Sequence, residues 1–161
     1  MKKTVALVED DARLRKQLVQ ILEDIDDIEC VIVCASAEEA LEKIPSKNPD
    51  VVLMDIKLPR MSGIQCVAEL KRILPEVQVI MVTVYEDSER IFKALKAGAS
   101  GYLVKSGPPE QLIAAIRDVF AGGAQCLATS RAKSCNTSTS WGPPQARQII
   151  SHLAKSRCWT Y

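Results

Sequence analysis

The chain has 161 residues, 47% of them hydrophobic, which suits one domain of ordinary size with a substantial core and a short appendage. Its formal net charge of +1 excludes a strongly charged protein, but it hides an asymmetry. Residues 1–124 hold 16 Lys+Arg and 20 Asp+Glu, whereas residues 125–161 hold five basic residues and no acid.

Two further classes are excluded by composition. The six Cys form no CxxC pair and His152 is the single histidine, so a zinc site is not expected. No apolar run approaches the roughly 18 residues of a membrane span, and the apolar run near the start is too short for a signal peptide. We therefore expect a cytoplasmic protein with no membrane association.

Strand and helix patterns alternate five times. Short apolar runs, typical of strands buried on both faces, lie at 5–8, 30–35, 51–54, 77–82 and 100–104. Apolar residues at helical spacing follow each run, at 14–22, 37–44, 64–74, 88–97 and 109–121. Five such units predict an α/β fold, with a doubly wound five-stranded parallel sheet covered by helices on both faces. We place this domain at residues 1–123.

Polar side chains stand where four of the predicted strands end. They are Glu9 and Asp10 after the first strand, Asp55 after the third, Thr83 after the fourth and Lys105 after the fifth. The carboxyl ends of parallel strands share one edge of the sheet, where open α/β sheets bind their ligands. The sequence therefore predicts that these side chains meet.

Their chemistry suits metal-assisted phosphoryl transfer to a carboxylate. Mg²⁺ prefers oxygen ligands, which Asp10 and Asp55 could supply directly and Glu9 through a water. If Asp55 attacks a phosphoryl group, negative charge spreads over the equatorial oxygens. Lys105 could neutralise that charge, and the Thr83 hydroxyl could donate a hydrogen bond to it.

Residues 1–123 resemble a response-regulator receiver domain of bacterial two-component signalling. The matching segments are Val-Glu-Asp-Asp at 8–11, Met-Asp-Ile-Lys-Leu-Pro at 54–59, Gly63, Val-Thr at 82–83, and Gly-Ala-Ser-Gly-Tyr-Leu-Val-Lys at 98–105. Five motifs in order cover the whole predicted domain. The resemblance implies a flavodoxin-like sheet of strand order 2-1-3-4-5.

The resemblance also implies a role for each matching site residue. These are Asp55 as phosphoacceptor, Asp10 and Asp55 as Mg²⁺ ligands with Glu9 assisting through water, the Lys57 backbone carbonyl as a further ligand, Thr83 as switch hydroxyl, Tyr102 as aromatic switch and Lys105 as phosphate-binding lysine. It implies Mg²⁺ as cofactor, a sensor histidine kinase as phosphodonor and a homodimer formed on phosphorylation. Such a protein is a signalling switch and not an enzyme, beyond slow self-dephosphorylation.

Plainer readings stand beside these roles. A strand-end Asp can cap a turn, the acids at 9–11 can serve a helix N-terminus, and Tyr102 can be packing. The sequence also departs from the family pattern: Val84 follows Thr83 where the family often has Ala, and Ser106 follows Lys105 where many members have Pro. The bulkier Val84 is expected to crowd access to the site.

Residues 124–161 are expected to be a linker and basic tail without a core of their own, with a short helix at 146–155 at most. Residues 122–124 resemble the end of receivers that carry a LuxR-type helix-turn-helix output domain. Back-translated and shifted by two bases, residues 125–133 and 150–161 both permit segments resembling that linker and the opening of that domain. We therefore expect a frameshift near residue 124 to have replaced the DNA-binding domain; the alternative is a native basic tail.

Two other functions remain open. A HAD-like aspartyl phosphatase also uses Asp, Mg²⁺ and Lys, but it usually carries a second Asp two residues after the nucleophile, where this chain has Lys57. The basic tail could instead bind nucleic acid by charge, weakly and in a salt-sensitive way, because it lacks helix-turn-helix patterning. With the intact output domain, the parent protein would regulate transcription.

Overall fold

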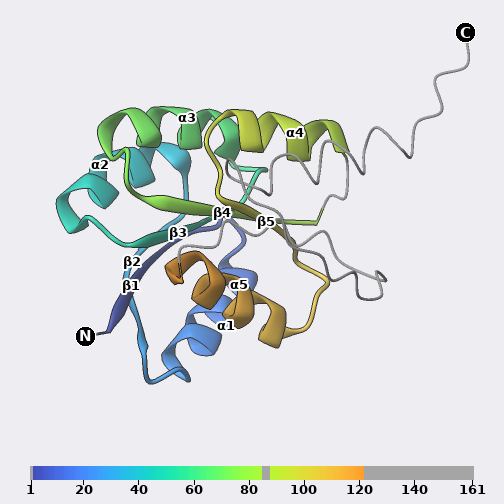
Figure 1. Ribbon diagram of the computed structural model, residues 1–161. Helices are drawn as coiled ribbons and strands as arrows, with labels where there is room; N and C mark the ends of the chain where they lie inside the picture. The colour runs from blue at the N-terminus through green and yellow to red at the C-terminus, as the bar shows by residue number, and fades with distance from the viewer. Residues whose placement is uncertain (1, 85–87, 122–161) are drawn as a thin grey trace, which may run out of the picture.

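A computed structural model describes residues 2–84 and 88–121 of the chain (Figure 1). The predicted domain boundary at 123–124 and everything expected of the tail lie outside these residues. The described elements are β1 (Lys3–Val8), α1 (Ala12–Glu23), β2 (Ile28–Cys34), α2 (Ala37–Lys47), β3 (Val51–Met54), α3 (Gly63–Ile73), β4 (Gln78–Thr83), α4 (Ser88–Lys96), β5 (Gly101–Val104) and α5 (Pro109–Phe120).

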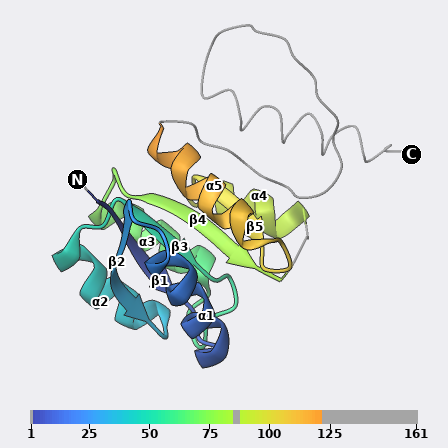
Figure 2. The ribbon, with the colours of Figure 1, turned by 90° about the horizontal axis from the view of Figure 1, so that it is seen from below.

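The five strands form one parallel sheet in the order β2-β1-β3-β4-β5, which confirms the predicted fold class and strand order. Helices α2, α3 and α4 cover one face, and α1 and α5 cover the other (Figures 1 and 2). Every residue of β3 and β5 is buried, because these strands are covered on both faces. This is why they appear in the sequence as continuous apolar runs.

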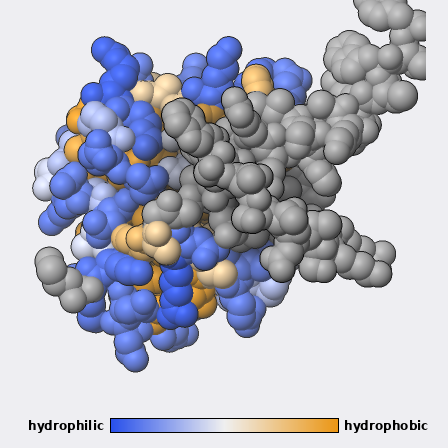
Figure 3. Space-filling view, viewed as in Figure 1, coloured by the Kyte–Doolittle hydropathy of each residue, from blue (hydrophilic) through white to orange (hydrophobic). Residues whose placement is uncertain are grey.

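The outer surface is mainly hydrophilic, as expected when the apolar residues are buried between the sheet and its helices. On the face seen in Figure 3, hydrophilic residues predominate and small hydrophobic patches lie between them. The large apolar side chains that are exposed in the described part are Val33, Ile73, Val84 and Phe92. Among the described helices, none is long and apolar enough to cross a membrane.

Helix boundaries differ from the sequence expectation mainly in α2. The apolar spacing predicted a helix that ends at Ile44, but α2 continues through Pro45 to Lys47. Proline forfeits one backbone hydrogen bond, and in the last turn this loss is small enough for the helix to continue. Asn48 then ends α2 in the left-handed conformation, with its N–H bonded to the carbonyl oxygen of Ile44.

The N-terminus of α2 carries half of a capping box. Ser36 accepts a hydrogen bond from the N–H of Glu39. The Glu39 carboxylate, however, accepts from the N–H of Ala35 at 2.8 Å rather than from Ser36. It also pairs with Lys43 one turn later, at 2.6 Å. A complete capping box occurs instead at α3, between Ser62 and Gln65.

The start of α3 packs directly against the end of β3. The N–H of Gly63 donates a hydrogen bond of 2.9 Å to the carbonyl oxygen of Ile56. A Cβ atom at Gly63 would overlap the backbone carbonyl oxygen of Asp55. Glycine at this position therefore lets the helix approach the segment that carries Asp55.

Because backbone cannot move aside as easily as a side chain, Gly63→Ala should lower the free energy of unfolding by about 1–3 kcal/mol, the usual cost of overpacking. Gly107→Ala is the matched control, since its new methyl group would mainly meet the flexible end of Gln111. Urea unfolding followed by circular dichroism measures both. Equal losses of unfolding free energy in the two variants would show that the close approach of Gly63 to Asp55 does not matter for stability.

Candidate functional site

The strand register gathers the predicted site residues at the carboxyl edge of the sheet. Val8 pairs with Met54, so Glu9 and Asp10 leave β1 beside Asp55, whose N–H donates to the carbonyl oxygen of Val8 at 3.0 Å. On the other side of β3, Thr83 ends β4. The N–H of Lys105, just beyond β5, donates to the carbonyl oxygen of Thr83 at 2.7 Å.

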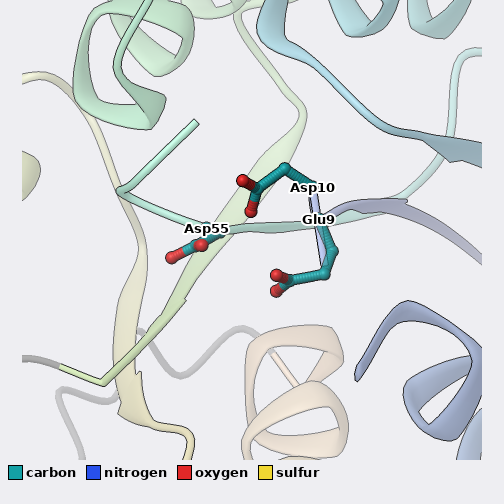
Figure 4. A group of neighbouring side chains, drawn as sticks. All are labelled: Glu9, Asp10 and Asp55. Carbon is teal, nitrogen blue, oxygen red and sulfur yellow. The ribbon is translucent and has the colours of Figure 1, made fainter. Parts of the chain in front are cut away.

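Three carboxylates converge at this edge. Glu9, Asp10 and Asp55 each offer an oxygen within 4.8 Å of the others (Figure 4). Glu9 and Asp55 are buried, whereas Asp10 is exposed. Like charges this close repel one another, and a divalent cation relieves the repulsion. An all-oxygen donor set with one side open to water fits Mg²⁺, which retains several of its waters when bound.

Lys105 joins two of these carboxylates. Its ammonium lies 2.6 Å from Oε2 of Glu9 and 2.9 Å from Oδ2 of Asp55. Burial alone would lower the pKa of Lys105, but hydrogen bonds to both carboxylates raise it above its ordinary value, so the group stays charged. Burial raises the pKa of Glu9, against the opposing effect of Lys105. Three carboxylates and this ammonium leave a formal charge of −2, which one Mg²⁺ would balance.

Thr83 and Tyr102 lie deeper in the sheet. The Thr83 side chain is fully buried, and its hydroxyl has no hydrogen-bond partner among the described residues. Such a group is rare in a native interior, because it loses its water without compensation. Tyr102 is 1% exposed and packs within the core on the α2–α4 face. Thr83 therefore holds an unused donor at the carboxyl end of β4, the strand next to β3.

Two other predicted positions lie toward solvent. Lys57 is exposed after β3, and the role expected of its backbone carbonyl stays a prediction. Val84 has 64% of its surface exposed, immediately after Thr83. The Val84 side chain therefore faces solvent next to Thr83. Whether it crowds access to the predicted phosphorylation site, as expected from the sequence, stays a prediction.

Arg15 is a site neighbour that the sequence analysis did not single out. Its guanidinium donates hydrogen bonds to the carbonyl oxygens of both Glu9 and Asp10. The available signal was position: Asp11 caps α1, and Arg15 follows it by four residues, one helical turn. A helix-interior arginine is usually read as a solvated side chain, so only the folded turn reveals this contact.

A groove lies beside the site, between α1 and the segment that joins β5 to α5. Its volume is about 730 Å³. Lys105 and Val82 form part of its wall, together with apolar residues of α1 such as Leu14, Leu18 and Ile21. The groove thus borders the residue that bridges Glu9 and Asp55.

The chain is similar to known proteins in both sequence and fold. The family described as the response regulator receiver domain matches residues 5–117. Response regulator GacA of Pseudomonas viridiflava is 39% identical over 118 residues, 73% of this chain and 55% of that protein. A LuxR-family two-component response regulator from Aurantimonas sp. SI85-9A1 has a solved structure with a TM-score of 0.75 and 28% identity, covering 96% of this chain and 99% of that one.

A second solved structure is the CheX-CheY-BeF3-Mg+2 complex from Borrelia burgdorferi. One of its chains matches with a TM-score of 0.69 and 28% identity, over 73% of this chain and 89% of that one. This chain spans about half the length of the curated relatives it matches. The matched segment nonetheless includes most of every strand and helix and all the clustered polar residues, and the chain belongs to the response regulator receiver domain family.

Proposed function

We propose that this chain is a phosphorylation-dependent signalling switch whose Asp55 carboxylate accepts a phosphoryl group from a sensor histidine kinase. The observation that carries the proposal is the convergence of Asp55 with two further carboxylates and the Lys105 ammonium. An unused hydroxyl donor, Thr83, ends the neighbouring strand. A carboxylate oxygen of Asp55 would bond to phosphorus while the phosphorus–nitrogen bond of a phosphohistidine breaks. The imidazole leaves with the electron pair of that bond.

Mg²⁺ fits the carboxylates as the metal of this reaction. Asp10 and Asp55 would hold it directly, with Glu9 acting through a water and the Lys57 carbonyl as a further ligand. When bound, the metal supplies positive charge to the phosphoryl oxygens. Support comes from the all-oxygen donor set and from the similar CheY complex, whose description names BeF3 and Mg.

Lys105 and Thr83 would read the phosphorylated state. The Lys105 ammonium already contacts the Asp55 carboxylate, so it can follow negative charge onto the phosphoryl oxygens. The Thr83 hydroxyl would gain the acceptor it lacks, which gives the phosphorylated state a favourable interaction absent from the other state. Movement of Thr83 would leave space for Tyr102 to change rotamer and alter the surface at α4 and β5, where a homodimer could form.

The groove beside Lys105 provides an approach for the phosphodonor. Its α1 side combines apolar residues such as Leu14 with polar ones such as Gln17, and its wall includes Lys105, which pairs with Asp55. A helix of the kinase bearing the phosphorylated histidine could enter there with its apolar face against α1. The groove therefore supports a sensor histidine kinase as the partner. The reaction would take place in the cytoplasm, where such kinases present their phosphohistidine.

A HAD-like phosphatase is the less favoured alternative. Its general acid would belong at position 57, where the chain presents an exposed lysine. Lysine cannot protonate a leaving group as a carboxylic acid does near neutral pH, since its pKa lies far higher. The receiver would therefore lose its phosphoryl group slowly, through water alone.

The parent protein would use this switch to regulate transcription through a DNA-binding output domain. Support comes from the LuxR-family description of a solved relative. We propose a receiver at 1–123 followed by a linker and tail at 124–161 that replaces the output domain through a shifted reading frame. In this form, sequence-specific DNA binding is not expected, and the basic tail would contact nucleic acid by charge alone.

Asp55→Asn should reduce phosphorylation by acetyl phosphate and Mg²⁺ below detection, because an amide oxygen is too weak a nucleophile. Intact-mass spectrometry of the chain counts the phosphoryl groups. Asp26→Asn is the control, since it removes an exposed carboxylate and should leave one phosphoryl group in place. Undiminished phosphorylation of Asp55→Asn would rule out Asp55 as the acceptor.

Thr83→Ala should separate stability from signalling. Removing a buried hydroxyl that lacks a partner should leave the free energy of unfolding unchanged or raise it by about 1 kcal/mol. The chemical-shift change that beryllofluoride and Mg²⁺ produce at Tyr102 should shrink, because the phosphoryl mimic loses its contact. Thr83→Ser restores the hydroxyl and should restore that change; a full response in Thr83→Ala would mean a passive Thr83.

Deleting residues 125–161 should leave both the thermal midpoint and the phosphorylation rate of Asp55 unchanged within measurement error. The reason is that the family match ends at residue 117 and the site lies wholly before it. The complementary chain, made from DNA with the reading frame restored at codon 124, should gain specific operator binding in a gel-shift assay. Specific binding by the chain as it stands would contradict the shifted-frame proposal.

A further inference from the structure

We infer that Arg15 is a positioning residue that holds the turn between β1 and α1 so that Glu9 and Asp10 face the metal, an inference that rests on the proposed Mg²⁺ site. A single nitrogen of its guanidinium, Nη1, lies 2.7 Å from the carbonyl oxygen of Glu9 and 3.1 Å from that of Asp10. Both residues of the carboxylate cluster that come from this turn are thus bound through their backbone by one side chain.

The turn needs such support because the regular ladder ends there. The N–H of Glu9 donates to the carbonyl oxygen of Cys34 at 3.1 Å, but Asp10 has passed the end of the sheet. Asp11 then caps α1, with its carboxylate bonded to the N–H groups of Arg13 and Leu14. Between sheet and cap, Arg15 binds the two carbonyl groups, and their orientation sets the direction of the Glu9 and Asp10 side chains.

Arg15 is itself anchored through its backbone at the start of α1, and its cation lies near enough to α2 to act on a carboxylate there. It belongs to the first turns of α1, where its N–H donates to the carbonyl oxygen of Asp11 at 2.8 Å. The Glu39 carboxylate of α2 has a lowered pKa, caused first by the N–H of Ala35 and then by Lys43, with a smaller contribution from the Arg15 cation. The Arg15 side chain is partly buried, and its hydrogen bond to Glu9 is the less exposed of the two.

The sign of the effect on metal affinity separates positioning from charge alone. A cation near a Mg²⁺ site repels the ion, so removing Arg15 for reasons of charge alone should tighten Mg²⁺ binding. If Arg15 orients the carboxylates, its removal should weaken binding, because the ligands must then be ordered by the metal. A role confined to folding would change the stability of the metal-free chain and leave the affinity as it was.

The test is calorimetric titration of the full chain with MgCl₂ alone, for the unaltered protein and for Arg15→Ala, Arg15→Lys and Lys16→Ala. Arg15→Ala should raise Kd about tenfold, which corresponds to roughly one charge-assisted hydrogen bond. Arg15→Lys keeps the charge but replaces the planar guanidinium by a shorter-reaching ammonium, so it should fall between the two. Lys16→Ala removes an exposed cation from the next position and should leave Kd unchanged or slightly lower.

Thermal unfolding of each metal-free variant establishes that it is folded at the titration temperature. If Arg15→Ala is unfolded, Arg15→Lys alone decides, because charge alone predicts no change for it. Unchanged or tighter Mg²⁺ binding by folded Arg15 variants would overturn the inference and leave the proposed function standing. Absence of Mg²⁺ binding by the unaltered chain would instead overturn the proposed metal site, and this inference with it.

Discussion

The buried ion pairs of Lys105 with Glu9 and Asp55 are the interaction on which the site depends. Two carboxylates at the end of a closely packed sheet would repel each other and would lack the solvation that they have in water. The Lys105 ammonium reduces the repulsion and replaces part of the lost solvation. Its single positive charge still leaves the three carboxylates of the cluster, Asp10 included, with a net negative charge. The domain can therefore fold with these carboxylates close together, and their remaining negative charge still favours binding of a divalent cation.

Backbone contacts around the site hold these charges in place. Gly63 brings the first turn of α3 against the carbonyl oxygen of Asp55, and the Ser62–Gln65 capping box fixes where that helix begins. On the other side, Arg15 binds the carbonyl oxygens of Glu9 and Asp10. Each of these acidic residues is thus held through its main chain, in addition to the ion pairs that Lys105 makes with Glu9 and Asp55.

Thr83 shows a different balance between stability and function. Its hydroxyl is buried without a partner among the described residues, a state that costs free energy and that an apolar residue of similar shape would avoid. A phosphoryl oxygen on Asp55 would supply the missing acceptor. The unphosphorylated fold therefore carries a small, local penalty that phosphorylation could relieve, and this difference is what a switch between two states requires.

The sequence by itself determined the fold class and predicted that Glu9, Asp55 and Lys105 meet at one edge of the sheet. Strands buried on both faces leave unbroken apolar runs, as at β3, and parallel strands bring their carboxyl ends to one edge, so Glu9, Asp55 and Lys105 could be grouped from their places after such runs. Only the tertiary structure decided how they are grouped. That Lys105 bridges two acids, that Glu39 bonds to Ala35 and that Arg15 reaches the turn of Glu9 depend on distances between separate segments, which no local pattern of residues encodes.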